Sequence, residues 1–265
     1  MDLQNIFSNY IYIFILIMVR YIGMFMIAPI FGSRVIPARV RLGFILFLSF
    51  ITLPILTNAQ GIGIPDIPDN LLAVMLAVLG EIAVGLSIGF ISYLLFAAIQ
   101  FAGHYMDLSM GFAIVNVIDP ISQTQAPVLG QFKNILAILV FFAINGHHLL
   151  LRAVYYSYQL IPLGNVSFSN AFFRYIFSIG SEFFRIAILI ALPVTGTLFV
   201  ATVILGFLAR TIPQMNIFVI GLPLKVLLGF LILSLSLVFT IYYFQDLFAW
   251  LYRSLSELIK LIGQG

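Results

Sequence analysis

Six apolar segments, nearly free of charge, dominate this 265-residue chain. The longest, 71–101, contains Glu81 as its one charged residue and exceeds the roughly 20 helical residues that cross the ~30 Å hydrocarbon core of a membrane. The other five are 6–31, 42–56, 128–144, 186–208 and 217–243. Because lipid offers the backbone no hydrogen bonds, and these segments are apolar on every face, we expect helices and not the strands of a β-barrel. The predicted fold is an all-α membrane protein of about six long hydrophobic helices in hairpins.

The scarcity of charge excludes most other classes of protein. Charged residues make up 8% of the chain and hydrophobic residues 63%, whereas soluble domains contain about 25% and about 45–50%. So few charged side chains cannot cover the surface of a soluble enzyme. The net charge of +3 is too small and too dispersed for a nucleic-acid surface. The chain has no cysteine, so it has neither a disulfide nor a thiolate metal site.

Two segments do not fit a simple set of spans. As a straight helix, 71–101 is about 46 Å long, so it must tilt, bend near Gly85 and Gly89, or project from the bilayer. The link 145–185 is apolar and aromatic but is no clean span. Its part 149–163 is predicted to be an amphipathic or interfacial helix. Gly85 and Gly89 also form a face of small residues, which is typical of closely packed helices.

The basic residues predict a topology that only the first half of the chain obeys. The densest basic loop, 34–41, is predicted to be cytoplasmic, with the N-terminus outside. Several arginines of the second half then fall on the outer side: Arg152, Arg174, Arg185 and Arg253. This conflict indicates a chain that does not sit in lipid as an ordinary integral protein.

Four charged residues lie within the apolar segments: Arg20, Glu81, Lys133 and Lys225. Each costs about 2.5–3.5 kcal/mol on insertion scales, so each is a candidate functional residue. One interpretation is a proton or ion relay, and the other is that these charges fix packing by pairing with one another or with neighbouring chains. The sequence favours packing, because a relay needs several carboxylates or histidines and Glu81 stands alone. Three bases cannot all pair with one acid, so some partners are expected from another subunit or from water.

No group of residues resembles a catalytic, metal or cofactor site. His147 and His148 are adjacent, and on a helix they would point about 100° apart. His104 and Asp107 could share a helix face, but two ligands do not make a zinc site. Motifs for a serine nucleophile, a zinc protease or a phosphate-binding loop do not occur. We therefore expect no enzyme, no metal and no cofactor.

The segment 110–125, MGFAIVNVIDPISQTQ, is unusual. It contains two apolar clusters, is interrupted by Asp119 and Pro120, which disfavour a helix, and ends in an uncharged polar run. Non-helical apolar backbone at membrane depth survives only where protein buries it or where it lines a cavity. The residues alone leave two interpretations equally open, a plug or gate loop within a channel and an ordinary interfacial connector.

Over nearly its whole length, the chain resembles the FliR family of the flagellar type III export apparatus and the SctT proteins of virulence secretion. The resemblance rests on the order and spacing of six segments: 20–32 (RYIGMFMIAPIFG), 36–43 (IPARVRLG), 81–90 (EIAVGLSIGF), 117–132 (VIDPISQTQAPVLGQF), 145–153 (NGHHLLLRA) and 209–225 (ARTIPQMNIFVIGLPLK). The last two segments look more flagellar than virulence-type.

The resemblance implies a channel-forming structural subunit of the flagellar protein export gate. FliR-like chains join FliP and FliQ chains in a closed spiral assembly, through which unfolded flagellar proteins cross the inner membrane. Residues 1–185 would be a FliP-like part, with a plug loop at about 106–127, and residues 186–265 a FliQ-like hairpin. The resemblance also implies contacts with FlhB, with rod or other axial proteins and with membrane lipid. The location would be the bacterial inner membrane at the flagellar basal body, partly raised toward the periplasm.

Carried over by position, the plug loop of the family falls on eight residues: Met110, Gly111, Phe112, Ile114, Val117, Ile118, Asp119 and Pro120. The apolar ones would close the pore, Gly111 would permit close backbone approach, and Asp119 with Pro120 would fix the turn. The loop that faces FlhB falls on Arg210, Pro213, Gln214 and Asn216.

Two alternatives remain beside this function. A secondary transporter or permease for a small solute would need an inverted repeat with broken helices in matching positions. Pro193 with Gly196 could break one helix, but the first half of the chain has no matching break. The second alternative is the homologous subunit of a virulence type III secretion system.

Overall fold

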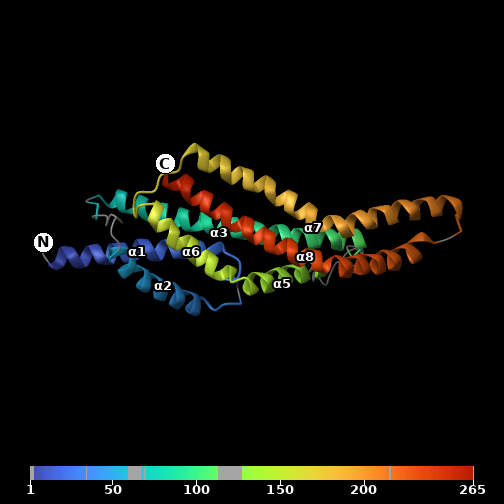
Figure 1. Ribbon diagram of the computed structural model, residues 1–265, viewed down its shortest axis with the longest axis horizontal. Coiled ribbons are helices and arrows are strands. Elements are labelled where there is room, and N and C mark those ends of the chain that lie inside the picture. Colours follow the sequence, from blue (N-terminus) through green and yellow to red (C-terminus); the bar gives the residue numbers. More distant parts are fainter. Residues whose placement is uncertain are drawn as a thin grey trace. The chain divides into compact units, whose positions relative to one another are not determined.

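Seven α-helices make up the regular structure of the described residues, which are 3–33, 35–58, 67–68, 70–112, 127–214 and 216–264 of a computed structural model (Figure 1). They are α1 (Leu3–Ile27), α2 (Ala38–Asn58), α3 (Leu71–Met110), α5 (Val128–Ala143), α6 (Gly146–Leu160), α7 (Asn170–Thr211) and α8 (Ile217–Gly263). Five are long and apolar enough to cross a membrane, or six spans if α5 and α6, bent by 68°, count as one. The predicted all-α membrane fold with about six long helices is confirmed.

The last two helices are longer than their apolar segments. α7 begins at Asn170, well before the predicted start at Ile186, and α8 continues to Gly263, well past Tyr243. The added turns carry charges such as Glu182 and Arg253, which end an apolar segment but do not end a helix. With 42 and 47 residues, the two helices are about 63 and 70 Å long, about twice the ~30 Å hydrocarbon core. Part of each therefore lies outside the hydrocarbon.

The break that a transporter would need in α7 does not occur. α7 runs through Pro193 and Gly196 without interruption. The carbonyl that Pro193 leaves without its helical donor is that of Leu189, four residues before it, and the loss of this one hydrogen bond does not interrupt the helix.

The helices form two compact units. Unit 1 comprises residues 1–94, 145–179 and 249–265, and unit 2 comprises residues 95–144 and 180–248. α3, α7 and α8 each contribute one part to each unit. These units differ from the parts proposed from the family resemblance, and a boundary between residues 185 and 186 stays a prediction about likeness to FliP and FliQ.

In unit 1, α1 and α3 meet backbone to backbone. A Cβ atom at Gly85 would lie 2.0 Å from the carbonyl oxygen of Arg20, and one at Gly89 would lie 2.9 Å from that of Met24. On the α1 side, a Cβ at Gly23 would lie 2.5 Å from the oxygen of Ile82. Only glycine permits this approach, so the close packing predicted for the Gly85–Gly89 face is confirmed.

The link after α5 contains the amphipathic helix that its sequence predicts. α6 buries Leu150, Val154 and Tyr158 on one face, while Arg152 lies exposed on the other. Asn145, between α5 and α6, has a positive φ of 57°, a left-handed conformation that asparagine adopts more readily than most residues. This residue lies where the two helices bend.

Unit 2 has an aromatic core and a second glycine contact. The rings of Phe96, Phe141 and Phe248 lie 5.0–5.7 Å apart by their centroids. α3 and α5 touch where a Cβ at Gly103 would lie 2.5 Å from Cα of Gly130. This contact holds together the two helices that flank the segment 113–126.

Candidate functional site

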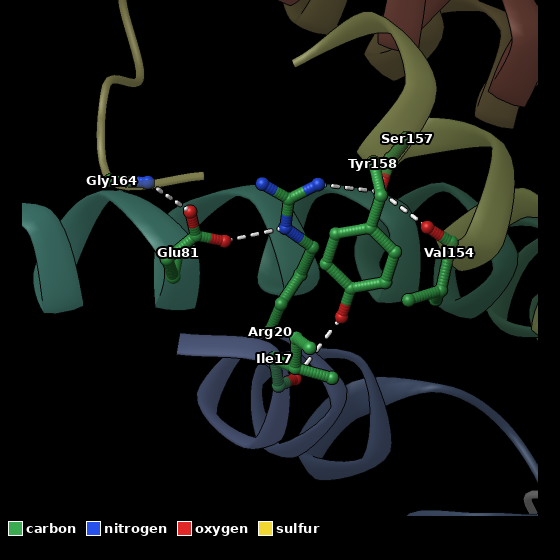
Figure 2. A network of polar contacts seen from close by, with 7 residues as sticks. All are labelled: Ile17, Arg20, Glu81, Val154, Ser157, Tyr158 and Gly164. Atoms are coloured by element: carbon green, nitrogen blue, oxygen red, sulfur yellow. Dashed lines mark hydrogen bonds and ion pairs between the residues drawn. The ribbon is translucent and has the colours of Figure 1, made fainter. Parts of the chain in front are cut away.

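Two of the four charges of the apolar segments form one buried ion pair in unit 1 (Figure 2). Arg20 lies on α1 and Glu81 on α3, and both side chains are 0% exposed. The Nε–H of Arg20 donates to Oε2 of Glu81 at 2.5 Å. The glycine contacts between α1 and α3 bring the two residues this close.

The pair is the centre of a network that reaches α6 and the loop after it. Nη1 of Arg20 donates to the hydroxyl of Ser157 at 2.9 Å, and the guanidinium lies 4.3 Å from the ring centroid of Tyr158. The hydroxyl of Tyr158 donates back to the carbonyl oxygen of Ile17 on α1 at 3.1 Å. The second oxygen of Glu81 accepts the backbone N–H of Gly164 at 2.9 Å. One guanidinium thus joins three helices, as Figure 2 shows.

Because the network is buried, breaking it should have a large effect on the free energy of unfolding. An unpaired ion in a low-dielectric interior costs several kcal/mol, and removing one member of a buried pair typically destabilises a protein by about 3–5 kcal/mol. The stacking of a guanidinium on a tyrosine adds about 0.5–2 kcal/mol. The described residues leave Nη2 of Arg20 without an acceptor, so the arginine is not fully satisfied.

The other two charges lie apart from this network, in unit 2. Lys133 on α5 is 1% exposed, and its ammonium donates to the hydroxyl of Thr240 on α8 at 3.1 Å. Lys225 on α8 is half-buried and lines a groove between helices. Within the described part of the chain, it makes no hydrogen bond or ion pair. The four predicted charges therefore occupy three separate places.

Three of the eight residues predicted for the plug are described, and two of them, Met110 and Phe112, lie against α8. Met110 is fully buried, and a Cβ at Gly229 would lie 2.5 Å from its terminal methyl carbon. Gly111 has a φ of 92°, which glycine adopts without strain. The ring of Phe112 lies 6.4 Å from that of Phe230. The other five residues lie outside the described residues: Ile114, Val117, Ile118, Asp119 and Pro120.

The sequence did not predict how Asp107 holds the start of α5. Its carboxylate, 4% exposed, accepts the backbone N–H groups of Leu129 at 3.1 Å and Gly130 at 3.3 Å. Pro127 at the N-cap of α5 makes no side-chain cap, so Asp107 of α3 satisfies these amides instead and favours the positive end of the helix dipole. The segment 113–126 is thereby flanked by two helices that are fixed to each other.

The four residues of the predicted FlhB-facing loop surround the turn between α7 and α8. Arg210, Pro213, Gln214 and Asn216 are all exposed. Asn216 starts α8, because its carbonyl oxygen accepts the N–H of Val219 at 3.1 Å. Gln214 is free to meet another protein.

Metal ligands do not gather in the described part of the chain. Among these residues, no three or more His, Asp or Glu side chains lie close enough together to hold a metal ion. His104 and Asp107 lie one helical turn apart on α3, but the carboxylate of Asp107 is engaged by backbone amides.

Long apolar helices locked by a buried ion pair and by glycine contacts define a polytopic helical membrane protein. Residues 11–251 match the family described as bacterial export proteins, family 1. The flagellar biosynthetic protein FliR of Bacillus subtilis is 36% identical, over 94% of this chain and 95% of its own length. FliR of Escherichia coli is 30% identical, over 92% and 91%, and FliR of Pectobacterium carotovorum is 29% identical, over 100% and 97%.

The chain belongs to the FliR family of bacterial flagellar export proteins. It is a membrane protein of flagellar biosynthesis and a component of the export apparatus, which implies partnership with other export components. The description of the matched family is one of export proteins and names no catalytic activity.

Proposed function

We propose that this chain is a channel-forming structural subunit of the flagellar type III export gate in the bacterial inner membrane, partly raised toward the periplasm. FliP and FliQ are its proposed partners in a spiral complex, and unfolded flagellar proteins, including rod and other axial proteins, are its proposed cargo. The observation that carries the proposal is the similarity to FliR over 94% of the chain. No cofactor and no catalytic step enter the proposed function.

The proposed plug is the segment 110–125, which seals the pore by steric and hydrophobic packing until cargo enters. Support comes from the two ends of the loop. Met110 is buried against α8, and Asp107 fixes the start of α5. Because Asp107 ties α3 to α5 at this base, the two helices are expected to stay together in the proposed gate.

The buried pair of Arg20 and Glu81 has a packing role in this proposal and not a relay role. Each oxygen of Glu81 already accepts a hydrogen bond from the chain itself. A proton relay needs a second acceptor in line with the first, and the described part of the network offers no other carboxylate. The pair supports the proposed gate by keeping α1, α3 and α6 in one rigid group.

Residues 186–265, which include most of α7 and all of α8, are proposed to be the FliQ-like part, and the turn between the two helices is proposed to contact FlhB. α7 and α8 are antiparallel neighbours, with residues of both lining one hollow that includes Pro193 and Thr240. The turn between them exposes Arg210, Pro213, Gln214 and Asn216. A photocrosslinker at Gln214 is expected to capture FlhB in an intact complex, and repeated failure there would count against this contact.

Native mass spectrometry tests the proposed assembly. When the chain is co-expressed with FliP and FliQ and extracted gently in detergent, we expect a single copy of it in a multi-subunit complex. A stable monomer or symmetric dimer would indicate the transporter alternative instead.

Deletion of residues 117–125 tests the plug separately. The variant is expected to assemble and to leak ions or small solutes across the inner membrane. A deletion that assembles normally and conducts nothing would show that the plug assignment is wrong.

A further inference from the structure

A groove in unit 2 combines long apolar walls with one cation. It has a volume of about 810 Å³ and lies between the last turns of α3, the middle of α7 and Lys225 of α8. Along α7 it extends from Phe184 to Thr202, which is about 27 Å on a helix. Phe101 and Phe183, whose rings are 5.7 Å apart, pack next to one end.

The polar groups of the groove gather near its other end. Lys225 and Thr202 each lie eight or nine residues from the α7–α8 turn, so both are about 12–14 Å from the tip of the hairpin. Ser109 of α3 also lines the groove, one residue before Met110, which packs on Gly229 of α8. The hydroxyls of Thr202 and Ser109 donate to carbonyls of their own helices, so Lys225 is the group that can bind an anion. A cation at one end of the groove, with aromatic and aliphatic walls beyond it, fits an amphiphile with an anionic head.

Lys225 has no acid to pair with in the described part of unit 2. Asp107 is engaged by the amides at the start of α5, and Glu182 pairs with Arg185. Asp246 lies about 30 Å further along α8. A half-buried ammonium among apolar side chains is costly, so the occupant of the groove is expected to supply the negative charge.

The size of the groove discriminates between two kinds of occupant. A helix of a partner protein, about 10 Å wide and 27 Å long, has a volume of roughly 2,000 Å³, so less than half of it could lie within the groove, whose volume is about 810 Å³. An acyl chain of about 16 carbons needs on the order of 500 Å³, if a methylene is about as large as a water molecule. All the lining residues belong to helices long and apolar enough to cross a membrane, where acyl chains are the solvent.

We propose that this groove binds an anionic phospholipid, with one of its two acyl chains along α7 and the phosphate at Lys225. The site goes beyond the export function proposed above and does not depend on the plug or on FlhB. It requires only that this part of α7 and α8 lies in a membrane. Phosphatidylglycerol is preferred over phosphatidylcholine, because among the described residues of unit 2 no free acid lies beside Lys225 to pair with a choline cation.

The test is native mass spectrometry of the full-length chain released from bilayer discs that contain equal amounts of phosphatidylglycerol and phosphatidylcholine. The wild-type chain is expected to retain phosphatidylglycerol. Lys225→Gln is expected to retain about fivefold less, the effect of one cation near a lipid phosphate, and Lys225→Arg to retain it as the wild type does. Lys260→Gln, an exposed lysine near the end of the same helix, is the matched control and is expected to change nothing.

A second pair of variants fills the groove without changing any charge. The nearest side-chain atom to a Cβ at Gly196 is 4.0 Å away, so the Cβ of Gly196→Leu has room. Because Gly196 lines the groove, the leucine side chain is expected to enter it and to displace the lipid. Gly206, on the same helix with nothing within 4 Å of a Cβ, gives the control Gly206→Leu, which is expected to retain it.

Three results would overturn the proposal. They are equal retention of the two lipids by the wild type, undiminished retention by both Lys225→Gln and Gly196→Leu, and a zero-length crosslink from Lys225 to a carboxylate of another protein in native membranes.

Discussion

Two ion pairs in the described residues use the same chemistry in opposite surroundings. In unit 1, Arg20 and Glu81 are 61 positions apart in the chain and both are fully buried. In unit 2, Arg185 and Glu182 are one helical turn apart on α7, with side chains 56% and 23% exposed. The first pair joins two helices, whereas the second lies along one helix that already exists without it.

The difference shows what a charge contributes in a chain with few charges. A buried pair is costly to form and much costlier to break, so it selects the one arrangement of α1, α3 and α6 that satisfies it. An exposed pair is solvated whether or not it forms, and it contributes little. Its charges keep part of α7 compatible with water or headgroups, which fits a helix about twice as long as the hydrocarbon core is thick.

Breaking the buried pair should have the largest effect. Glu81→Gln leaves the guanidinium of Arg20 buried beside a neutral amide, and we expect it to lower the free energy of unfolding by about 3–5 kcal/mol. Thermal unfolding of the purified protein measures this, and swimming motility reports export.

The double variant Arg20→Met with Glu81→Gln separates packing from a relay. It removes both charges and keeps an amide oxygen for the N–H of Gly164, so stability should return toward that of the wild type and motility with it. A stable double variant that cannot export would mean that the charges themselves are needed, and the relay interpretation would replace packing.

The glycine contact beside the pair should be the next most sensitive point. Gly85→Ala places a Cβ 2.0 Å from the oxygen of Arg20, so α1 and α3 must separate, at a cost of about 1–3 kcal/mol. Gly180→Ala on α7, with open space around the new Cβ, is the control and should stabilise by about 0.5–1 kcal/mol. Equal melting temperatures for the two variants would contradict the close contact.

The fold was largely predictable because its helices are apolar and its glycines are spaced for packing. An apolar segment as long as 71–101 can only be a helix, because a membrane span must satisfy its own backbone hydrogen bonds. The Gly85–Gly89 face predicts close packing against another helix, although it does not identify that helix. The start of α7 and the end of α8 could not be predicted from the lengths of the apolar segments. A charged residue such as Glu182 ends an apolar segment, but it is a good helix former and the helix continues through it.

The sequence identified the charged residues of the site but not the contacts that they make. Arg20 and Glu81 both stood out as charges in apolar segments, but three bases competed for one acid, and only the approach of α1 to α3 selects Arg20. The sequence relates Asp107 only to His104, one helical turn before it, and two ligands do not make a metal site. Its contact with Leu129 depends on the meeting of α3 and α5, which no local sequence pattern encodes.

The caps of two helices extend the comparison from ion pairs to helix ends. Asp107→Ala leaves the amides of Leu129 and Gly130 buried without an acceptor, and should cost about 1–3 kcal/mol. Asn70→Ala removes the exposed cap of α3, where the side-chain oxygen of Asn70 accepts the N–H of Leu72 at 3.0 Å, and should cost about 0.5–1 kcal/mol. Hydrogen exchange at the first turn of α5 should rise only for Asp107→Ala. A rise for neither variant would mean that water replaces the carboxylate.

Breaking the exposed pair should have the smallest effect. Arg185→Ala removes the Nε–H that donates to Glu182 at 2.8 Å, yet both groups already contact solvent, so the expected loss is about 0.2–1 kcal/mol. Salt sharpens the contrast, because 1 M salt reduces the Debye length to about 3 Å and screens an exposed pair far more than a buried one. The difference in melting temperature between wild type and Arg185→Ala should therefore shrink at high salt, while that between wild type and Glu81→Gln persists. If the Arg185→Ala difference is large and independent of salt, then α7 is covered at this point in the assembled protein, and the pair belongs to an interface.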